Sequence, residues 1–163
     1  MVLPMNKPKL ASSTSAPATS DTVVQHLTKV LADTYVLGVK THGAHWNVTG
    51  ADFFRLHGVF DEQYHALLLA ADDIAERVRA LGAVVPGSMR QLLEHTAVGE
   101  PPVGYDAMVV QALRDDHRQI AVRCREAISV AAAAHDQGSA DLLTSRSVAH
   151  DKIAWMLTAT LDE

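Results

Sequence analysis

The sequence has a single cysteine, Cys124, among 163 residues. One cysteine excludes a disulfide within the chain and argues against a cysteine-based zinc site. This composition suits the reducing cytoplasm, where we expect the protein to act, either free or associated with the nucleoid. The sequence also lacks a run of about 18 apolar residues, and residues 1–20 lack the apolar core of a signal peptide. We therefore expect neither a membrane span nor a secretory leader.

Positive charge is scarce as well. There are 14 lysines and arginines against 19 aspartates and glutamates, which gives a net charge of -5 when the histidines are neutral. A protein body of this sign is not built to attract nucleic acid. Histidine, in contrast, is abundant, with 9 residues in the chain. Histidines serve as metal ligands as well as surface and core residues, so their positions must decide between these roles.

The chain divides into a short tail and one domain. Residues 1–20 are mostly small polar residues and prolines with little to bury, and we expect them to form a flexible tail. Residues 21–163 carry apolar residues at helical spacing and lack strand patterns, which predicts a single all-α domain. The predicted helices are 20–48, 51–81, 88–94, 106–135 and 139–161. Four long helices in this order predict an antiparallel bundle, with the short helix inside the connection 83–105.

The clearest apolar stripe follows one face of the second predicted helix, at steps of three and four residues. Its members are Phe53, Leu56, Phe60, Tyr64, Leu67, Ala71, Ile74, Val78 and Leu81. On the later long helices we expect Met108, Trp155 and Met156 to pack inward as well. We assign Trp46 and Cys124 to the core too, the cysteine as a small buried hydrophobe.

A second stripe on the same helix consists of His57, Asp61, Asp72 and Glu76, which are residue types that bind metal ions. His57 and Asp61 are four residues apart, as are Asp72 and Glu76, so each pair shares a helix face. Eleven residues separate Asp61 from Asp72, so the pairs point to nearly the same side but lie about 16 Å apart. Metal–ligand bonds of about 2 Å cannot bridge that distance. The pairs either act separately, as ordinary solvated side chains, or meet through another chain.

A second copy of the chain would bring the two pairs together. If this helix packs antiparallel on its own copy, with a two-fold axis near residues 66–67, His57 and Asp61 face the partner's Asp72 and Glu76. The end of the first helix adds His45, which the following turn brings back towards the start of the second helix. Two imidazoles and three carboxylates suit iron or manganese, although zinc could also enter. Carboxylates at such an interface are costly to bury unless a cation or a partner group compensates their charge.

At these residues the sequence resembles the Dps family, the mini-ferritins that protect DNA in starved cells. The matching segment runs from Thr41 to Gly82 and agrees in residue type and spacing. It contains His45-Trp46-Asn47, Gly50, Phe53, Leu56-His57, Asp61, Asp72-Asp73-Ile74-Ala75-Glu76-Arg77 and Leu81-Gly82. Helix order, the short helix in the long connection, and Asp151-Lys152 ahead of Trp155 extend the similarity to nearly all of the chain after the tail.

The resemblance implies a ferritin-like bundle that assembles as a hollow homododecamer. It implies ferroxidase sites at the two-fold interfaces, with His45, His57 and Asp61 from one subunit and Asp72 and Glu76 from the other. The family oxidises Fe(II), usually with hydrogen peroxide, and stores the ferric product inside. Peroxide is consumed without release of hydroxyl radicals, and this spares DNA.

The resemblance also suggests an iron entry pore at a three-fold axis, lined by acids near the start of the last long helix. Asp141 matches best and Asp136 less well, although Asp141 could equally be an acid that stabilises the helix N-terminus. His42 and His65 flank the proposed site. Either could bind a second, weaker metal ion or relay protons, but ordinary polar histidines are the simpler interpretation. Trp46 could donate electrons that quench radicals, if it does not belong to the core.

Two other functions use the same features. A DNA-binding protein that compacts the nucleoid would need positive charge, but the tail offers only Lys7 and Lys9. Because phosphate contacts drive such binding, we expect weak DNA binding at most near neutral pH. A helical bundle that sequesters zinc or manganese without redox turnover would use the same ligands, so the sequence leaves that alternative open.

Overall fold

The computed structural model describes residues 19–102, 104 and 107–161, and these residues form five helices and no strand. The helices are α1 (Thr19–Asn47), α2 (Phe53–Ala80), α3 (Met89–Leu93), α4 (Ala107–Ala133) and α5 (Gln137–Leu161). The all-α prediction is therefore confirmed, and the predicted helix ends lie within about two residues of the observed ones. Of the predicted tail, residues 1–18 lie outside the described residues. Within the described ranges, no helix combines the length and the apolar character that crossing a membrane requires.

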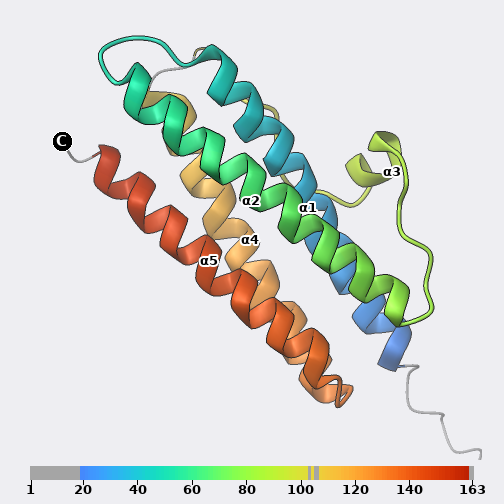
Figure 1. Cartoon of the computed structure of the whole chain (residues 1–163). Coiled ribbons are helices and arrows are strands. Elements are labelled where there is room, and N and C mark those ends of the chain that lie inside the picture. The colour runs from blue at the N-terminus through green and yellow to red at the C-terminus, as the bar shows by residue number, and fades with distance from the viewer. Residues whose placement is uncertain (1–18, 103, 105–106, 162–163) are drawn as a thin grey trace, which may run out of the picture.

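The four long helices form two antiparallel hairpins that lie side by side (Figure 1). Short turns join α1 to α2 and α4 to α5, and the members of each hairpin contact each other extensively. The segment between α2 and α4 runs back along the bundle, and α3 lies within it to one side of the α1–α2 pair (Figure 1). α1 and α4 also pack together, which joins the two hairpins. This is the predicted four-helix bundle with a short extra helix.

The core lies between the four long helices and is built from one apolar stripe on each. Its largest buried side chains are Phe60, Leu27, Leu37, Leu67, Ile74, Leu113, Ile120, Leu143 and Leu157. Burying each such side chain contributes about 1.5–3 kcal/mol relative to leaving it in water. Cys124 is buried in this core as predicted. Tyr64, which the sequence predicts to be a core residue, is only half-buried, and the inward position beside it is taken by Gln63.

Four large apolar side chains predicted to pack inward are exposed in the single chain. They are Trp46 (66% exposed), Met108, Trp155 (67%) and Met156. The predicted core roles are therefore wrong within one chain. Trp155 follows the buried Ala154, and a helix turns about 100° per residue, which takes the indole off the narrow buried stripe.

Two turns of the chain depend on glycine. Gly50 lies between α1 and α2 with a φ of 94°, and Gly82 follows α2 with a φ of 86°. Both values are in the left-handed region, which a residue without a Cβ adopts at no steric cost. The two glycines lie just beyond the predicted ends of the first two long helices, residues 48 and 81, and the observed helices end at Asn47 and Ala80. The short helix α3 is capped by Ser88, whose hydroxyl accepts a hydrogen bond from the backbone N–H of Gln91.

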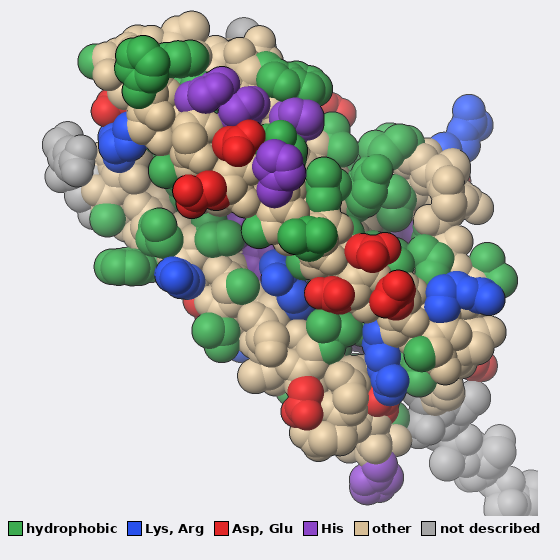
Figure 2. Space-filling model, viewed as in Figure 1, with side chains coloured by type: hydrophobic (Ala, Val, Ile, Leu, Met, Phe, Trp, Pro, Cys, Tyr) green, Lys and Arg blue, Asp and Glu red, His purple; other side chains and the backbone are tan. Residues whose placement is uncertain are grey.

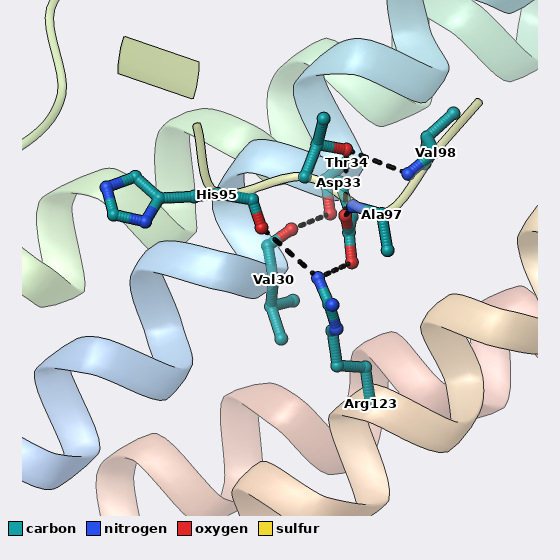
Figure 3. Close-up of polar contacts among 8 residues, drawn as sticks. Val30, Asp33, Thr34, His95, Ala97, Val98 and Arg123 are labelled. Atoms are coloured by element: carbon teal, nitrogen blue, oxygen red, sulfur yellow. Dashed lines mark hydrogen bonds and ion pairs between the residues drawn. The ribbon is translucent and has the colours of Figure 1, made fainter. Parts of the chain in front are cut away.

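A buried carboxylate, Asp33 of α1, holds the long connection onto the bundle (Figure 3). Its Oδ1 accepts hydrogen bonds from the Thr96 hydroxyl at 2.8 Å and from the backbone N–H of Ala97 at 2.7 Å. Its Oδ2 pairs with the Arg123 guanidinium of α4 at 2.7 Å. Arg123 also donates to the backbone oxygen of His95 at 3.4 Å. One side chain therefore ties α1, the connection and α4 together.

A second buried charge on α1 repeats this arrangement seven residues later. The Lys40 ammonium lies 2.7 Å from Oδ2 of Asp116 on α4 and donates to the backbone oxygen of Gly99 at 3.0 Å. Burial raises the pKa of the Asp116 carboxyl, and the Lys40 charge opposes that rise. Together with the Asp33–Arg123 pair, this contact fixes the antiparallel register of α1 against α4.

We predict that Asp33→Ala destabilises the protein strongly, because it leaves the Arg123 charge and two other donors without their shared acceptor. Removing one partner of a buried ion pair lowers the free energy of unfolding by about 3–5 kcal/mol. Unfolding by urea at a fixed protein concentration measures the loss. Asp33→Asn keeps the shape and one accepting oxygen and should cost less, and Glu126→Ala, at an exposed acid of α4, should cost little. Equal stability of Asp33→Ala and Glu126→Ala would contradict the role of Asp33 in holding α1, the connection and α4 together.

Candidate metal centre

His45 and His57 lie against each other where α1 and α2 join. His45 is in the last turn of α1 and His57 is near the start of α2, and the two rings stack with their centroids 3.8 Å apart. Nδ1 of His45 lies 2.9 Å from the backbone oxygen of His57, and Nδ1 of His57 lies 2.9 Å from the backbone oxygen of His45. This reciprocal pair of hydrogen bonds fixes the orientation of both rings.

The same hydrogen bonds determine which nitrogen can bind a metal ion. A carbonyl oxygen only accepts, so Nδ1 of each ring carries the proton, and the neutral imidazole keeps its lone pair at Nε2. The His45 side chain is 14% exposed, and its Nε2 lies 3.9 Å from Oδ1 of Asp61, whose side chain is 46% exposed. The structure thus brings three of the predicted ligands, His45, His57 and Asp61, to one place on the α1–α2 hairpin.

Aromatic rings surround this place. His42 stacks on Tyr64 with the ring centroids 3.9 Å apart, and it also contacts Trp46 at 4.0 Å. The exposed ring of His65 lies 4.1 Å from Tyr64, and its Nδ1 donates to the backbone oxygen of Asp61 at 2.9 Å. Loss of hydration raises the pKa of the half-buried Tyr64 phenol, and the negative charge of Asp61 raises it further. The phenol therefore stays protonated at neutral pH.

Asp72 and Glu76 lie farther along α2, on its exposed side. The eleven residues between Asp61 and Asp72 correspond to about 16 Å of helix, so one chain does not bring the two groups of predicted ligands together. Among the residues that the structure describes, no three histidine, cysteine or acidic side chains converge closely enough to hold a metal ion. A single chain therefore carries two separate parts of the predicted site.

The surface around Asp72 is apolar. Asp72 lines a groove of about 330 Å³ between α1, α2 and the segment that leads to α3, together with Leu68 and Met89. Leu68, Leu69, Met89 and Leu93 are exposed large hydrophobic side chains of this region. In Figure 2, histidines gather near the end where α1 and α2 join, acidic side chains gather farther along the same face, and hydrophobic side chains lie between them.

The two acids suggested for an entry pore differ in their surroundings. Asp136 is the cap of α5, because its Oδ1 accepts from the backbone N–H of Ser139 at 3.0 Å, and it also pairs with Arg77. This cap explains why α5 begins at Gln137, two residues before the predicted start. The hydrogen bonds from Ser139 and the Arg77 charge lower the pKa of Asp136 even though burial opposes them. Asp141 is exposed and accepts a hydrogen bond from the Gln137 side chain. Its place in an entry pore stays a prediction.

A buried histidine pair in the core is a feature that the sequence reasoning missed. His117 of α4 and His150 of α5 are both fully buried, and their Nδ1 atoms lie 2.9 Å apart. Burial lowers the pKa of His117 to about 3, with help from the Arg146 charge, and burial likewise lowers that of His150. The sequence contained a signal for this pair, because both histidines fall at the spacing of the apolar stripes of their helices.

Known proteins resemble this chain in sequence and in fold. Residues 24–163 match the ferritin-like domain family, which gives the class of the bundle. The chain is 34% identical over 142 residues to DNA protection during starvation protein 2 of Bacillus anthracis, covering 86% of this chain and 97% of that protein. The Dps structure from Bacillus brevis has a TM-score of 0.86 at 32% identity, covering 90% and 99% of the two chains.

A third relative, the Dps protein from Vibrio cholerae O1, has a TM-score of 0.84 at 30% identity and covers 88% of this chain and 91% of that one. It is described as a member of a broad superfamily of ferritin-like diiron-carboxylate proteins. The protein is thus a ferritin-like helical bundle. Within that class, the chain belongs to the Dps family.

We predict that the buried pair makes the protein less stable as the pH falls. Unfolded His117 takes up a proton below its ordinary pKa of 6.5, whereas the folded residue does so only near 3. Between these values the unfolded state binds more protons, so the free energy of unfolding falls by about 1.4 kcal/mol per pH unit for this one group. Urea unfolding between pH 7 and pH 5 measures the slope.

The double variant His117→Leu/His150→Leu should flatten this slope, because neither apolar replacement titrates. His95→Gln, at an exposed histidine, is the control and should keep the wild-type slope. A double variant with the wild-type slope would show that other groups cause the pH dependence.

Proposed function

We propose that this protein is a ferroxidase and iron-storage mini-ferritin that acts in the cytoplasm and limits oxidative damage to DNA. Fe(II) is its substrate, hydrogen peroxide is the preferred oxidant with oxygen as the alternative, and the ferric product is stored inside a hollow dodecamer. The observation that carries the proposal is the reciprocal pair of hydrogen bonds between His45 and His57. It leaves two stacked imidazoles with open Nε2 atoms beside a carboxylate, in a chain of the Dps family.

Each proposed ligand has a distinct part. The backbone hydrogen bonds of His45 and His57 hold their rings in place, so the rings do not have to be ordered when Fe(II) binds. Asp61 adds a negative charge that attracts the cation and compensates the charge that iron gains on oxidation. Asp72 and Glu76 of a second subunit would complete the set, with two nitrogens and three carboxylates around the substrate.

Three features support a site shared between two subunits. The single chain separates the two groups of ligands by about 16 Å along α2. The face that carries them also exposes Leu68 and Leu69, which an antiparallel partner helix would cover. Exposed apolar side chains beside polar ones are typical of protein interfaces. Trp46, exposed next to His45, also lies where a partner would bury it.

The oxidant fits the proposed protection of DNA. Two Fe(II) ions each give one electron to hydrogen peroxide, its O–O bond breaks, and both oxygens leave as water after uptake of two protons from solvent. Because both electrons are supplied at one site, no hydroxyl radical is released. The names of two relatives, one a protein of DNA protection during starvation and one a ferritin-like diiron-carboxylate protein, support iron chemistry and DNA protection in general, and the peroxide step is our proposal.

We predict that Asp61→Ala and Asp72→Ala each slow the oxidation of Fe(II) by roughly 100-fold or more, because each removes a proposed ligand. Loss of a residue that only supports a metal ligand already lowers metal affinity or activity by about 10–100-fold. The protein is loaded anaerobically with Fe(II), peroxide or oxygen is added separately, and absorbance follows ferric iron. Glu62→Ala and Asp73→Ala are matched controls at neighbouring exposed acids and should keep the wild-type rate. Wild-type rates in Asp61→Ala and Asp72→Ala would remove both residues from the site. Fe(II) binding without oxidation by the wild type would favour metal sequestration instead.

Co-assembly of the two inactive variants tests whether the site is shared. In a dimer of one Asp61→Ala and one Asp72→Ala subunit, one site keeps every ligand and the other loses two. Random pairing makes half of the dimers mixed, so about a quarter of the wild-type sites should be restored. Ferroxidase activity after coexpression measures the recovery. Coexpression of Asp61→Ala with His57→Ala is the control, because one subunit supplies both residues to the same site and no recovery is expected. No recovery in the first mixture would place the two residues in separate sites.

DNA compaction is the alternative function, and the charge of the chain weighs against it. The net charge is -5, and the tail contributes only two lysines. We predict weak DNA binding that disappears as salt rises and that is lost when residues 1–20 are removed. A gel shift at low and moderate salt measures it. Strong, salt-resistant binding by the truncated protein would place DNA binding on the helical domain.

A further inference from the structure

A groove of about 600 Å³ lies between the N-terminal half of α1 and the connection that contains α3. We call it the α1 groove. Its lining residues are Val24, Gln25, Thr28, Lys29, Val84, Val85, Pro86, Gln91, Glu94 and His95. None of the proposed metal ligands is among them, so the groove is separate from the candidate metal centre.

The α1 groove is also distinct from the groove beside Asp72. Val85 and Pro86 line both, so the segment 84–86 lies between the two. The groove beside Asp72 is lined in part by α2, whereas no residue of α2 lines the α1 groove. An antiparallel partner on α2 would therefore not by itself fill the α1 groove.

The lining of the α1 groove offers apolar surface and hydrogen-bond donors to a peptide. Val84 is 84% exposed, and Val24 and Val85 are partly buried. The backbone N–H groups of Val84 and Val85 have no hydrogen-bond partner among the described residues. Exposed apolar side chains next to free backbone donors are features that bind an extended peptide.

Two opposite charges line the α1 groove. Glu94 directly follows α3 and Lys29 belongs to α1, and both side chains are exposed. Neither forms an ion pair with another described residue. A positively charged peptide would therefore place its cations on the Glu94 side of the groove, away from Lys29.

The N-terminal tail carries the complementary chemistry within residues 2–10. This part contains four large apolar residues and two lysines, which are Val2, Leu3, Met5, Leu10, Lys7 and Lys9. Pro4 and Pro8 restrict the backbone and favour an extended chain. Residues 11–18 are only alanine, serine, threonine and proline. The tail thus divides into a part that can bind an apolar surface and a part that can only connect.

The connecting part is long enough to bring residues 2–10 to the α1 groove of the same chain. Val24 and Lys29 lie five and ten residues after Thr19, the first residue of α1, which corresponds to about 8 and 15 Å along the helix. Eight residues, 11–18, span at most about 26–29 Å. A linker that just spans its site gives the tethered segment a high effective concentration there.

We propose that residues 2–10 dock in the α1 groove of their own chain. Apolar side chains of the tail pack on Val24 and Val84, and Lys7 or Lys9 pairs with Glu94. Exposed ion pairs contribute little by themselves, so the apolar contacts provide most of the affinity. Docking holds the tail lysines on the protein surface, where it competes with DNA for them. This inference does not depend on the proposed ferroxidase function.

Carbodiimide cross-linking of the full-length protein tests the contact, because the reagent joins a lysine amine to a carboxylate beside it. We expect peptide mass spectrometry to find Lys7 or Lys9 joined to Glu94. Coexpression of a subunit that lacks residues 2–10 with a Glu94→Gln subunit should abolish this link, since only contacts between chains could then form it. Persistence of the link in that mixture would overturn docking within one chain, and tail lysines joined only to other carboxylates would overturn the docking site.

The rate of tryptic cleavage after Lys9 measures how often the tail is docked, since trypsin does not cut at Lys7, which precedes a proline. Docking for about 80% of the time slows this cleavage about fivefold, so Glu94→Lys and Val84→Asp should each accelerate it by up to that factor. Glu100→Lys makes the same charge change at an exposed acid of the connection outside the groove and should keep the wild-type rate. Equal rates in the wild type and all three variants would overturn the proposal.

A gel shift at low salt tests the competition with DNA. Glu94→Lys and Glu100→Lys add the same charge to the helical domain, so a difference between their shifts reports the released tail. We expect Glu94→Lys to shift DNA at a lower protein concentration than Glu100→Lys. Equal shifts by the two variants would overturn the competition.

Discussion

The two buried ion pairs between α1 and α4 are the contacts on which the rest of the bundle depends. Asp33–Arg123 and Lys40–Asp116 join the two hairpins in one register, and both α1 residues also bind the backbone of the long connection. Buried charges tolerate no slip, because a shift of one residue would leave them unpaired. The register then sets where the C-terminal half of α1 lies, and so fixes the position of His45 against α2.

Histidines in this chain have different chemistry in different surroundings. His45 and His57 are ordered by backbone oxygens at the hairpin end and keep Nε2 open. His117 and His150 lie in the core, where burial keeps them neutral and they hydrogen-bond to each other. The abundance of histidine alone could not separate the two pairs, because each role is set by the groups that the fold places around the ring.

The sequence also does not show whether an apolar side chain packs into its own core or against another subunit. The sequence predicted the core stripe of α2 correctly at most positions, but Trp46, Trp155 and Met156 are exposed in the single chain. A residue that packs against another subunit has the same spacing and apolar character as one that packs against its own core. The proposed shared site is subject to the same limit, because in that proposal Asp72 and Glu76 meet the other ligands only when another subunit is present.

The all-helical architecture, the ends of the first two long helices and the candidate ligands on α2 follow from the sequence alone, because helix spacing and glycine conformation are local properties of the chain. Family membership also followed from the spacing of residues between Thr41 and Gly82. Three features depend on the folded chain: the open nitrogen of His45 and His57, the cap that Asp136 makes on α5, and the hydrogen bond between His117 and His150. These features arise from contacts between residues distant in sequence, whose distances and burial exist only after the helices have packed.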